Sequence, residues 1–216
     1  MKSWEDYLQP NGTLRNKLEI TDDEELRVVE YNVSRQAQQL IRQNHYVIAG
    51  YQLTGRDVTE LRRINQALLG DIYDWAGQYR EVDFNKNSNG VVTHFHPVSL
   101  FGNAEWDLQR QLTEFAALPS DKVVVADALG DLVTAPNMFH PFREGNGRTP
   151  RVFTAVLARQ KGSEPEVHAR TTGSLHDSQY PRRPKTNGRD ISRDFTLTEN
   201  AKMDSFSEKK ENESIF

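Results

Sequence analysis

The chain has 216 residues, a net charge of −4 at neutral pH, 27% charged residues and no cysteine. This length fits one domain with a tail, or at most two small domains, and allows a sizeable hydrophobic core. The lack of cysteine excludes disulfides and thiolate metal sites, and the weak negative charge gives no electrostatic case for a nucleic acid partner.

Targeting and membrane signals are not evident in the sequence. The N-terminal segment 1–6 has no apolar signal region, and no apolar run is long enough to span a bilayer. We therefore expect a cytoplasmic protein without a membrane partner. Delivery from the cytoplasm to a host or neighbouring cell stays open as an alternative.

Helical patterns dominate the first third of the chain, after an extended lead-in. Thr21 and Glu24 form a capping-box pattern that predicts the start of a helix. A second helix, with Asp57 as its cap, is expected to end at Gly77, because glycine commonly follows the last residue of a helix. We interpret Trp75 as core packing. The apolar stripes are Leu26, Val29, Val33, Ala37 and Leu40 in the first helix and Leu61, Ile64, Leu68, Ile72 and Trp75 in the second.

A β-hairpin is predicted over residues 82–95, where loosely alternating polarity surrounds an Asn-Gly pair, a strong signal for a two-residue turn. His94 and His96 alternate on its second strand and would suggest a metal site only together with His140. We expect no such site, because the sequence offers neither a fourth ligand nor supporting residues.

Two amphipathic helices are expected to follow the hairpin. Ser99 can cap the first, and Asp121 can cap the second after the break at Pro119. Pro136 lies near the end of the second helix and is expected to kink it just before His140.

The segment 140–151, with the sequence His-Pro-Phe-Arg-Glu-Gly-Asn-Gly-Arg-Thr-Pro-Arg, carries the groups that a nucleotide site needs. Gly145 and Gly147 flank Asn146, so the backbone can turn several N–H groups toward one point and bind an anion. The apolar period that follows predicts a helix, whose N-terminus favours the same anion. A phosphate group is therefore the expected occupant.

Charged side chains surround this predicted phosphate site. Arg148 and Arg151 are three residues apart on the expected helix, so both can face the phosphate, which a guanidinium binds through two parallel bonds. Glu144 is placed to hold Mg²⁺, which proteins usually bind through one or two carboxylates plus phosphate oxygens. His140 supplies a base. Lys86 on the hairpin can approach the phosphate, although a solvated lysine explains it equally well.

Segment 140–151 resembles the signature of the Fic family, H-P-F-x-[DE]-G-N-G-R-x-x-R, at each of its fixed positions. Three shorter segments, 7–8, 14–17 and 74–80, are also similar to parts of that family. The resemblance implies an all-α, mainly helical Fic domain over residues 1–162, with a small β-hairpin called the flap at 82–95.

The family resemblance implies a protein adenylyltransferase, which transfers AMP from Mg·ATP to a Ser, Thr or Tyr hydroxyl of another protein. In this reaction His140 would accept the hydroxyl proton, Glu144 would hold Mg²⁺, and the flap would bind the target protein as an added strand. The nucleotide-binding residues that follow from the resemblance are Lys86, Gly145, Asn146, Gly147, Arg148 and Arg151.

Other activities and a silent module are the alternatives. Some Fic proteins transfer phosphate or phosphocholine, or remove AMP, but the intact Gly-Asn-Gly-Arg run favours AMP transfer. A catalytically silent Fic-like module that binds nucleotide or a partner protein is the alternative from another class. Pro136 favours that alternative, as does the lack of recognisable core helices after Gly162.

Residues 163–216 contain few apolar residues and no helical or strand period, so we predict a mostly disordered tail. Within it, Ser207 and Glu211 match the pattern [ST]-x-x-x-E-[GN] of the family's inhibitory helix. The resemblance implies that Glu211 would pair with Arg151 and block ATP, although the charged setting favours a solvated tail. A small inhibitory protein is a further partner that the family resemblance allows.

Overall fold

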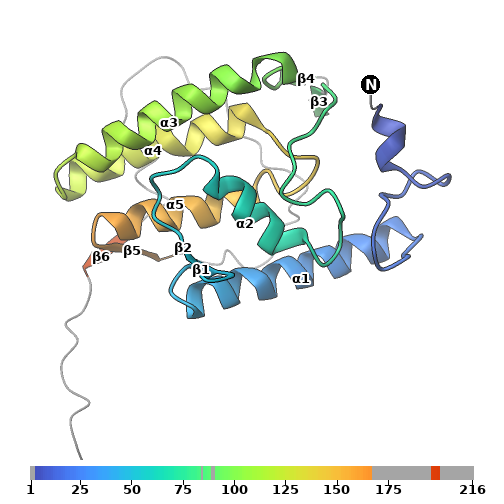
Figure 1. The fold of residues 1–216 in the computed structure, drawn as a ribbon, viewed down its shortest axis with the longest axis horizontal. Helices are drawn as coiled ribbons and strands as arrows, with labels where there is room; N and C mark the ends of the chain where they lie inside the picture. Colours follow the sequence, from blue (N-terminus) through green and yellow to red (C-terminus); the bar gives the residue numbers. More distant parts are fainter. Residues whose placement is uncertain (1–2, 84, 89–90, 167–195, 200–216) are drawn as a thin grey trace, which may run out of the picture.

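The computed structural model describes residues 3–83, 85–88, 91–166 and 196–199. This part of the chain contains five α-helices, which confirms the mainly helical fold expected from the sequence. Among these described helices, none is long and apolar enough to cross a membrane. In space they follow the order α1, α2, α5, α4, α3, and each helix packs against the next (Figure 1). Their bounds are α1 Asp23–Gln43, α2 Glu60–Leu69, α3 Phe101–Ala117, α4 Lys122–Phe139 and α5 Arg148–Gln160.

Helix α5 lies at the centre of this arrangement, between α2 and α4 (Figure 1). Every residue from Val152 to Ala158 is buried, so the helix is covered on all sides rather than along one stripe. Thr154, the polar residue in this run, donates its hydroxyl proton to the Pro150 carbonyl at 2.8 Å. Pro150 lies in the first turn, where its missing N–H breaks no helical hydrogen bond. The last residues of the signature segment, 148–151, therefore form the first turn of a largely buried helix.

Helix α1 does not begin with the cap that the sequence pattern predicts. Asp22 is the N-cap, and its carboxylate accepts the backbone N–H of Glu25 at 2.8 Å. The carbonyl of Thr21 instead accepts side-chain hydrogen bonds from Asn11 and Thr13, both at 2.7 Å. The prediction of Thr21 as the cap is wrong because the lead-in segment, and not the helix, uses this residue.

Helix α2 ends at Leu69, so the expected C-terminus at Gly77 is wrong. Gly77 has a φ of 74° and belongs to a turn that contacts α2 from outside the helix. Its N–H donates to Asn65 Oδ1 at 2.8 Å, and its carbonyl accepts from Arg62 Nε at 2.9 Å. A Cβ at Gly77 would lie 2.8 Å from the Cβ of Gln66, so glycine is required for this turn rather than for a helix end.

Aromatic rings anchor the N-terminal segment to the core. A 3₁₀-helix, η1 (Trp4–Tyr7), places the Tyr7 ring edge-on to Trp75, with 5.9 Å between the ring centroids. Trp75 stacks on Tyr73, with centroids 4.3 Å apart, and packs against the hydrophobic core. The interpretation of Trp75 as a core residue is confirmed.

Helices α3 and α4 pack side by side, and α4 leads directly to the signature segment (Figure 1). Asp121 caps α4 as predicted, because its carboxylate accepts two N–H groups of the first turn at 3.0 and 3.1 Å. Ser99 does not cap α3, since it lies in a 3₁₀-helix, η2 (Val98–Leu100), that runs straight into α3. Helix α4 continues through Pro136 as far as Phe139.

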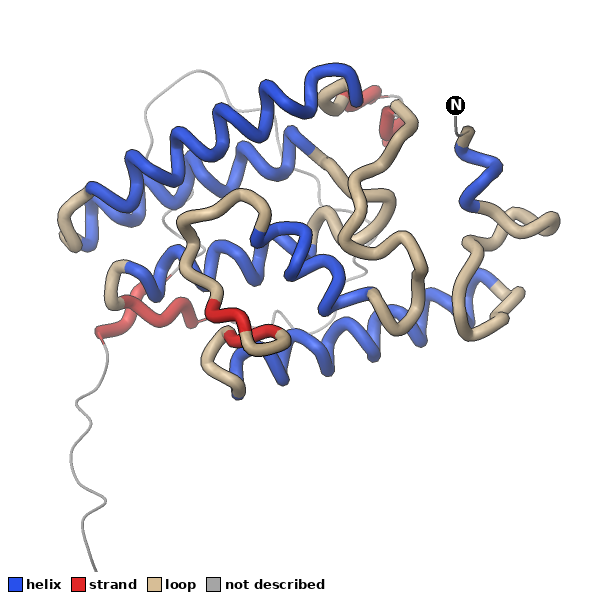
Figure 2. The backbone as a smooth tube through the Cα atoms, viewed as in Figure 1, coloured by secondary structure: helices blue, strands red, loops and turns tan. Residues whose placement is uncertain are grey.

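The described strands form three antiparallel pairs (Figure 2). In the second pair Asn85 lies opposite His94, which confirms the hairpin predicted over residues 82–95. The third pair lies within the segment predicted as a disordered tail, and the rest of that tail lies outside the described residues. The strands are β1 Val47–Ile48 with β2 Tyr51–Gln52, β3 Asn85–Ser88 with β4 Val91–His94, and β5 Ser163–Glu166 with β6 Thr196–Glu199.

Candidate active site

The loop between α4 and α5, residues 140–147, is closed by the side chain of Asn146. Its Oδ1 accepts the backbone N–H of Phe142 at 2.9 Å, and its Nδ2 donates to the Phe142 carbonyl at 2.7 Å. Both residues are buried. Asn146 therefore shapes the loop through its amide, which leaves its backbone N–H, rather than its side chain, for an anion.

Helix α2 fixes the same loop through Asn65, which is fully buried. Its Nδ2 donates to the Glu144 carbonyl at 3.0 Å and to Thr149 Oγ1 at 3.2 Å, while its Oδ1 accepts the Gly77 N–H. Gly145 passes over this amide with a φ of 84°, and a Cβ there would lie 2.7 Å from Asn65 Nδ2. Glycine is thus required at 145 both by backbone conformation and by space.

In the part of the chain that the structure describes, the backbone N–H groups of residues 145–148 donate to no protein acceptor. They lie at the N-terminus of α5, where the first turn of a helix leaves such groups without helical partners. The helix dipole adds partial positive charge at the same end. This row of N–H groups can bind an anion such as phosphate.

His140 lies at the C-terminus of α4 in a left-handed conformation, with φ 47° and ψ 56°. This conformation is costly for a residue other than glycine, and such residues cluster at functional sites. The His140 ring stacks on Phe95, with 3.8 Å between centroids and 20° between planes. Its Nδ1 lies 3.4 Å from the Asn137 carbonyl oxygen. The imidazole is thus held between the end of α4 and the segment that follows β4.

The Glu144 carboxylate is half-buried and accepts a hydrogen bond from Arg143 NH1 at 2.7 Å. Burial raises the pKa of this carboxyl above its ordinary range, and the nearby carboxylate of Glu30 raises it further. The neighbouring guanidinium groups of Arg143 and Arg148 act in the opposite direction. A divalent cation beside Glu144 would offset the repulsion between the two acids.

Helix α1 engages the first signature arginine. Arg148 donates to Ser34 Oγ at 2.8 Å and forms an ion pair with Glu30, and both partners lie on α1. Glu30 also accepts the Tyr73 hydroxyl at 2.5 Å, so its carboxylate is shared between a guanidinium and a phenol. Arg148 is therefore oriented by α1 in the described arrangement.

The second signature arginine lies over the loop. Arg151 is exposed, and its NH2 group is 3.7 Å from the point that a Cβ on Gly147 would occupy. Gly147 itself has a right-handed conformation, with φ −94° and ψ −34°. The structure thus places Arg151 beside the row of N–H groups and Arg148 against α1.

The remaining predicted residues are on the hairpin or outside the described ranges. Lys86 is on β3, where its Cα pairs with that of Thr93 on β4. Ser207 and Glu211, the residues of the predicted inhibitory pattern, lie outside the described residues. The contact between Glu211 and Arg151 therefore stays a prediction.

The hairpin histidines have partners other than a metal. His94 Nδ1 is 2.9 Å from Asn85 Oδ1, and His96 Nδ1 is 3.1 Å from the Met138 carbonyl oxygen. Within the described ranges, no group of three or more His, Cys, Asp or Glu residues is arranged to hold a metal ion. A metal at the signature loop would therefore have Glu144 as its carboxylate and take other ligands from a bound nucleotide and water.

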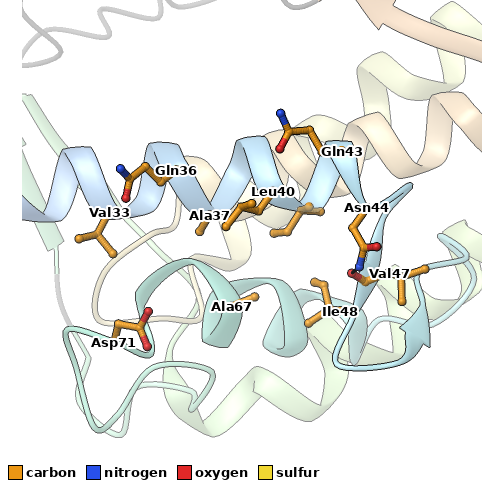
Figure 3. A pocket seen from close by; sticks show the side chains of 11 residues that line it. Val33, Gln36, Ala37, Leu40, Gln43, Asn44, Val47, Ile48, Ala67 and Asp71 are labelled. Atoms are coloured by element: carbon orange, nitrogen blue, oxygen red, sulfur yellow. Dashed lines mark hydrogen bonds between the residues drawn. The ribbon is translucent and has the colours of Figure 1, made fainter. Parts of the chain in front are cut away.

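A cavity of about 600 Å³ lies elsewhere, between α1, α2 and the β1–β2 hairpin (Figure 3). None of the signature residues lines it. The cavity is thus separate from the loop that carries the base, the acid and the row of N–H groups. Its lining includes Val33, Ala37, Leu40, Val47, Ile48 and Ala67.

Sequence reasoning missed three residues that hold the site, namely Glu30, Asn65 and Arg80. Asn65 is a polar residue beside the apolar stripe of α2, and a buried amide needs partners, so this position carried a usable signal. Arg80 is also buried, and its Nε donates to the His140 carbonyl at 2.9 Å. Glu30 gave no local signal, because charged residues are common on an outer helix.

Comparison with known proteins decides the family. The Fic/DOC family model matches residues 55–158. A probable protein adenylyltransferase Fic of Escherichia coli K12 is 32% identical over 158 residues, which cover 72% of this chain and 73% of that protein. The chain belongs to the Fic/DOC family. The resemblance that the signature segment predicts is thus confirmed.

Two further comparisons bear on this Fic protein. The protein adenylyltransferase VbhT of Bartonella schoenbuchensis is 32% identical over 159 residues, which cover 72% of this chain and 31% of VbhT. The structure of BepC from Bartonella tribocorum with bound AMPPNP has a TM-score of 0.63 at 22% identity, and covers 75% of this chain and 80% of that chain. The chain therefore matches under a third of VbhT and shares its fold with BepC.

Proposed function

We propose that this Fic protein transfers AMP from Mg·ATP to the hydroxyl group of a Ser, Thr or Tyr in a target protein. The observation that carries the proposal is the row of N–H groups at residues 145–148, which donate to no acceptor among the described residues and adjoin the loop that carries His140 and Glu144. An anion site, a base and a carboxylate on one loop match the needs of phosphoryl chemistry. The relatives that are named protein adenylyltransferases support the same reaction.

In the proposed reaction, the hydroxyl oxygen of the target attacks the α-phosphorus of ATP, and the bond from that phosphorus to the β-phosphate oxygen breaks. His140 takes the hydroxyl proton, AMP stays on the target, and pyrophosphate leaves. The N–H groups of residues 145–148 bind phosphate oxygens, and Arg151 neutralises charge on the leaving group. Arg148 can join it once its guanidinium exchanges Glu30 for phosphate.

Mg²⁺ fits the residues of this loop. The ion prefers oxygen ligands and usually takes one or two carboxylates, while phosphate and water oxygens complete its shell. Glu144 offers such a carboxylate. Burial and, next, the nearby Glu30 carboxylate raise its pKa, and a cation beside it would offset the repulsion between the two carboxylates. Glu144 would hold the ion, which supplies charge neutralisation to the phosphates when bound.

The target protein is proposed to dock on the flap formed by β3 and β4. Among the described residues this sheet has two strands, so each keeps an outer edge without a neighbouring strand. An extended segment of the target can pair with such an edge through main-chain hydrogen bonds. Phe95 follows β4 and stacks on His140, so a segment docked there would lie near the base.

Mass spectrometry of a lysate incubated with the protein, Mg²⁺ and ATP tests this function. We expect peptides that gain one AMP on a Ser, Thr or Tyr, and no such gain when a chelator removes Mg²⁺. Phosphate or phosphocholine adducts in place of AMP would contradict the proposal. The lack of any adduct, although the protein binds Mg·ATP, would contradict it as well.

A nucleotide-binding module without transfer is the second candidate function. The engagement of Arg148 by Glu30 and Ser34 favours it, because this guanidinium is occupied in the described arrangement. A thermal shift with Mg·ATP, measured beside transfer of labelled AMP, separates the two functions. Binding without transfer supports the module, and binding with transfer supports the enzyme.

Replacement of Glu144 by Gln is expected to weaken Mg²⁺-dependent ATP binding. It should also alter how stability depends on pH, because the raised pKa means that the folded protein binds this proton more tightly than the unfolded chain does. The stability that this proton contributes is fully present below the ordinary Glu range. It is lost as the pH rises through the raised pKa.

Two measurements check this prediction. Denaturant unfolding of the parent and Glu144→Gln, from about pH 4 to about pH 8, should show the parent losing stability relative to the variant as the pH rises. Calorimetric titration with ATP should show a smaller gain from Mg²⁺ in the variant. Equal Mg·ATP affinity in both proteins would count against Glu144 as the metal ligand.

A further inference from the structure

We propose that Arg80 is a positioning residue for AMP transfer, because its guanidinium ties the backbone of His140 to both ends of the flap. The inference rests on the proposed function, since the position of a base matters for a rate only if the base acts. The Arg80 side chain is fully buried, so it acts through its neighbours rather than by touching nucleotide or target.

The Arg80 guanidinium donates to backbone carbonyls of three separate segments. Its Nε donates to His140 at 2.9 Å, its NH1 to Val82 at 2.8 Å and its NH2 to His96 at 2.6 Å. The backbone N–H of Arg80 adds a bond to the Pro141 carbonyl at 2.7 Å. The first two residues of the signature are therefore bonded to one residue that precedes the flap.

Both ends of the flap meet at this guanidinium. Val82 precedes β3 and His96 follows β4, and the backbone N–H of His96 donates to the Met138 carbonyl near the end of α4 at 3.3 Å. Phe95, whose ring stacks on His140, is the residue before His96. Arg80 therefore fixes the backbone of the base and also the segment that carries its stacking partner.

A guanidinium suits this role because it is planar and its N–H groups point in fixed directions. Carbonyls that accept from one rigid fork keep a fixed arrangement, which a flexible ammonium group does not impose. Asp83 supports the fork, because its Oδ1 lies 3.5 Å from Arg80 NH1 and accepts the Val98 N–H at 2.6 Å. The Phe101 ring lies 4.8 Å from the guanidinium carbon. The buried charge is thus held on several sides.

The functional consequence concerns the rate and not ATP binding. A hydroxyl on a target docked at the flap must come within hydrogen-bond distance of the imidazole. A displacement of about 1 Å between such groups can lower a rate by about 100-fold. Without the Arg80 guanidinium, the flap would be tied to His140 by fewer contacts, through the Phe95 ring and the contact of His96 with Met138. Asn65 would still hold the loop at Glu144. Turnover should therefore fall while ATP affinity stays.

A buried cation that only stabilises the fold provides the matched control. Lys161 is buried, and its Nζ donates to the carbonyls of Ala116 and Leu118 at 3.0 and 2.6 Å. It follows the last residue of α5, at the opposite end of that helix from the signature loop. Lys161→Met should therefore lower stability without changing transfer per folded molecule.

The test compares Arg80→Lys, Arg80→Met and Lys161→Met in the full chain. Self-modification with Mg²⁺ and α-labelled ATP gives the saturated rate and the half-saturating ATP concentration, with the rate scaled to the folded fraction from circular dichroism. We expect the saturated rate to fall by about 100-fold in Arg80→Met and about 10-fold in Arg80→Lys. The half-saturating ATP concentration should stay within about twofold of the parent value in all variants.

Nuclear magnetic resonance of the His140 imidazole adds a readout that does not depend on transfer. Its ring signals should shift or broaden in both Arg80 variants and keep the parent positions in Lys161→Met. Parent rates per folded molecule in the Arg80 variants, or parent His140 signals, would overturn the inference. A parent that binds Mg·ATP without self-modification or transfer would overturn the proposed function instead, and the imidazole signals would then decide the role of Arg80 alone.

Discussion

Replacement of His140 by Ala is expected to lower AMP transfer by about two to four orders of magnitude, while Mg·ATP affinity stays nearly unchanged. The imidazole acts on the incoming hydroxyl and not on the bound nucleotide. The imidazole stacks on Phe95, at the end of the flap. The N–H groups of residues 145–148 lie at the end of a loop that Asn65 and Asn146 hold without any contribution from the His140 side chain. Saturated transfer rates and calorimetric ATP titrations measure the two quantities.

The left-handed backbone of His140 calls for a second variant at the same position. Asn, like His, is enriched in this conformation among residues other than glycine, so His140→Asn removes the base and keeps the backbone preference. The matched control is His45→Asn. His45 also has a left-handed backbone, is exposed, and follows the C-terminus of α1, outside the signature loop. Substantial transfer by either His140 variant would contradict the role of the imidazole, and so would an equal loss in His45→Asn.

Local sequence determines the backbone turn of the signature loop, so this part of the site could be predicted from the sequence. The glycine pair predicts a backbone turn, and Gly145 has a φ of 84° at the N-terminus of α5. Asn146 shows the limit of that reasoning. The sequence predicts Asn146 as a nucleotide-binding residue but does not tell which of its atoms would bind, and the structure directs both polar atoms of its side chain to Phe142. A short pattern names the residues but not which of their atoms are already in use.

The supporting contacts were beyond sequence reasoning because they join distant parts of the chain. Asn65 reaches Glu144 across 79 positions, Arg80 reaches His140 across 60, and Arg148 reaches Glu30 across 118. Helical periodicity places an apolar stripe on a face, but it does not tell which polar side chain beside the stripe meets a loop from elsewhere.

The predicted start of α1 and the predicted end of α2 were wrong for a related reason. The sequence pattern predicts Thr21 as the cap, but the lead-in segment uses the Thr21 carbonyl, and Asp22 caps the helix. Gly77 is of the residue type that commonly follows the last residue of a helix, but its hydrogen bonds to Asn65 and Arg62 place it in a turn against α2. In both cases a tertiary hydrogen bond overrides a local preference, whereas Asp121 accepts two N–H groups of the first turn and caps α4 as expected.

Replacement of Gly145 by Ala is expected to destabilise the protein by roughly 2–5 kcal/mol, and transfer should fall by about 100-fold or more. The new Cβ would lie 2.7 Å from Asn65 Nδ2 and 2.9 Å from Leu69 Cδ1, at a φ of 84° that alanine disfavours. Relief of this overlap would push the Asn65 amide away from Glu144 and Thr149. The loop that carries the N–H row would then lose its support from α2.

Gly147→Ala is the matched control for the stability part of this prediction. Gly147 has right-handed φ and ψ, and the nearest atom to an added Cβ is the flexible end of Arg151 at 3.7 Å. Alanine there should leave stability unchanged or raise it by up to about 1 kcal/mol, because it restricts the unfolded chain. Denaturant unfolding of both variants measures the difference in their free energies of unfolding. Calorimetric titration with Mg·ATP measures whether the N–H groups of residues 145–148 still bind nucleotide. If Gly145→Ala unfolds at the same denaturant concentration as Gly147→Ala, the close approach of the loop to Asn65 does not constrain residue 145.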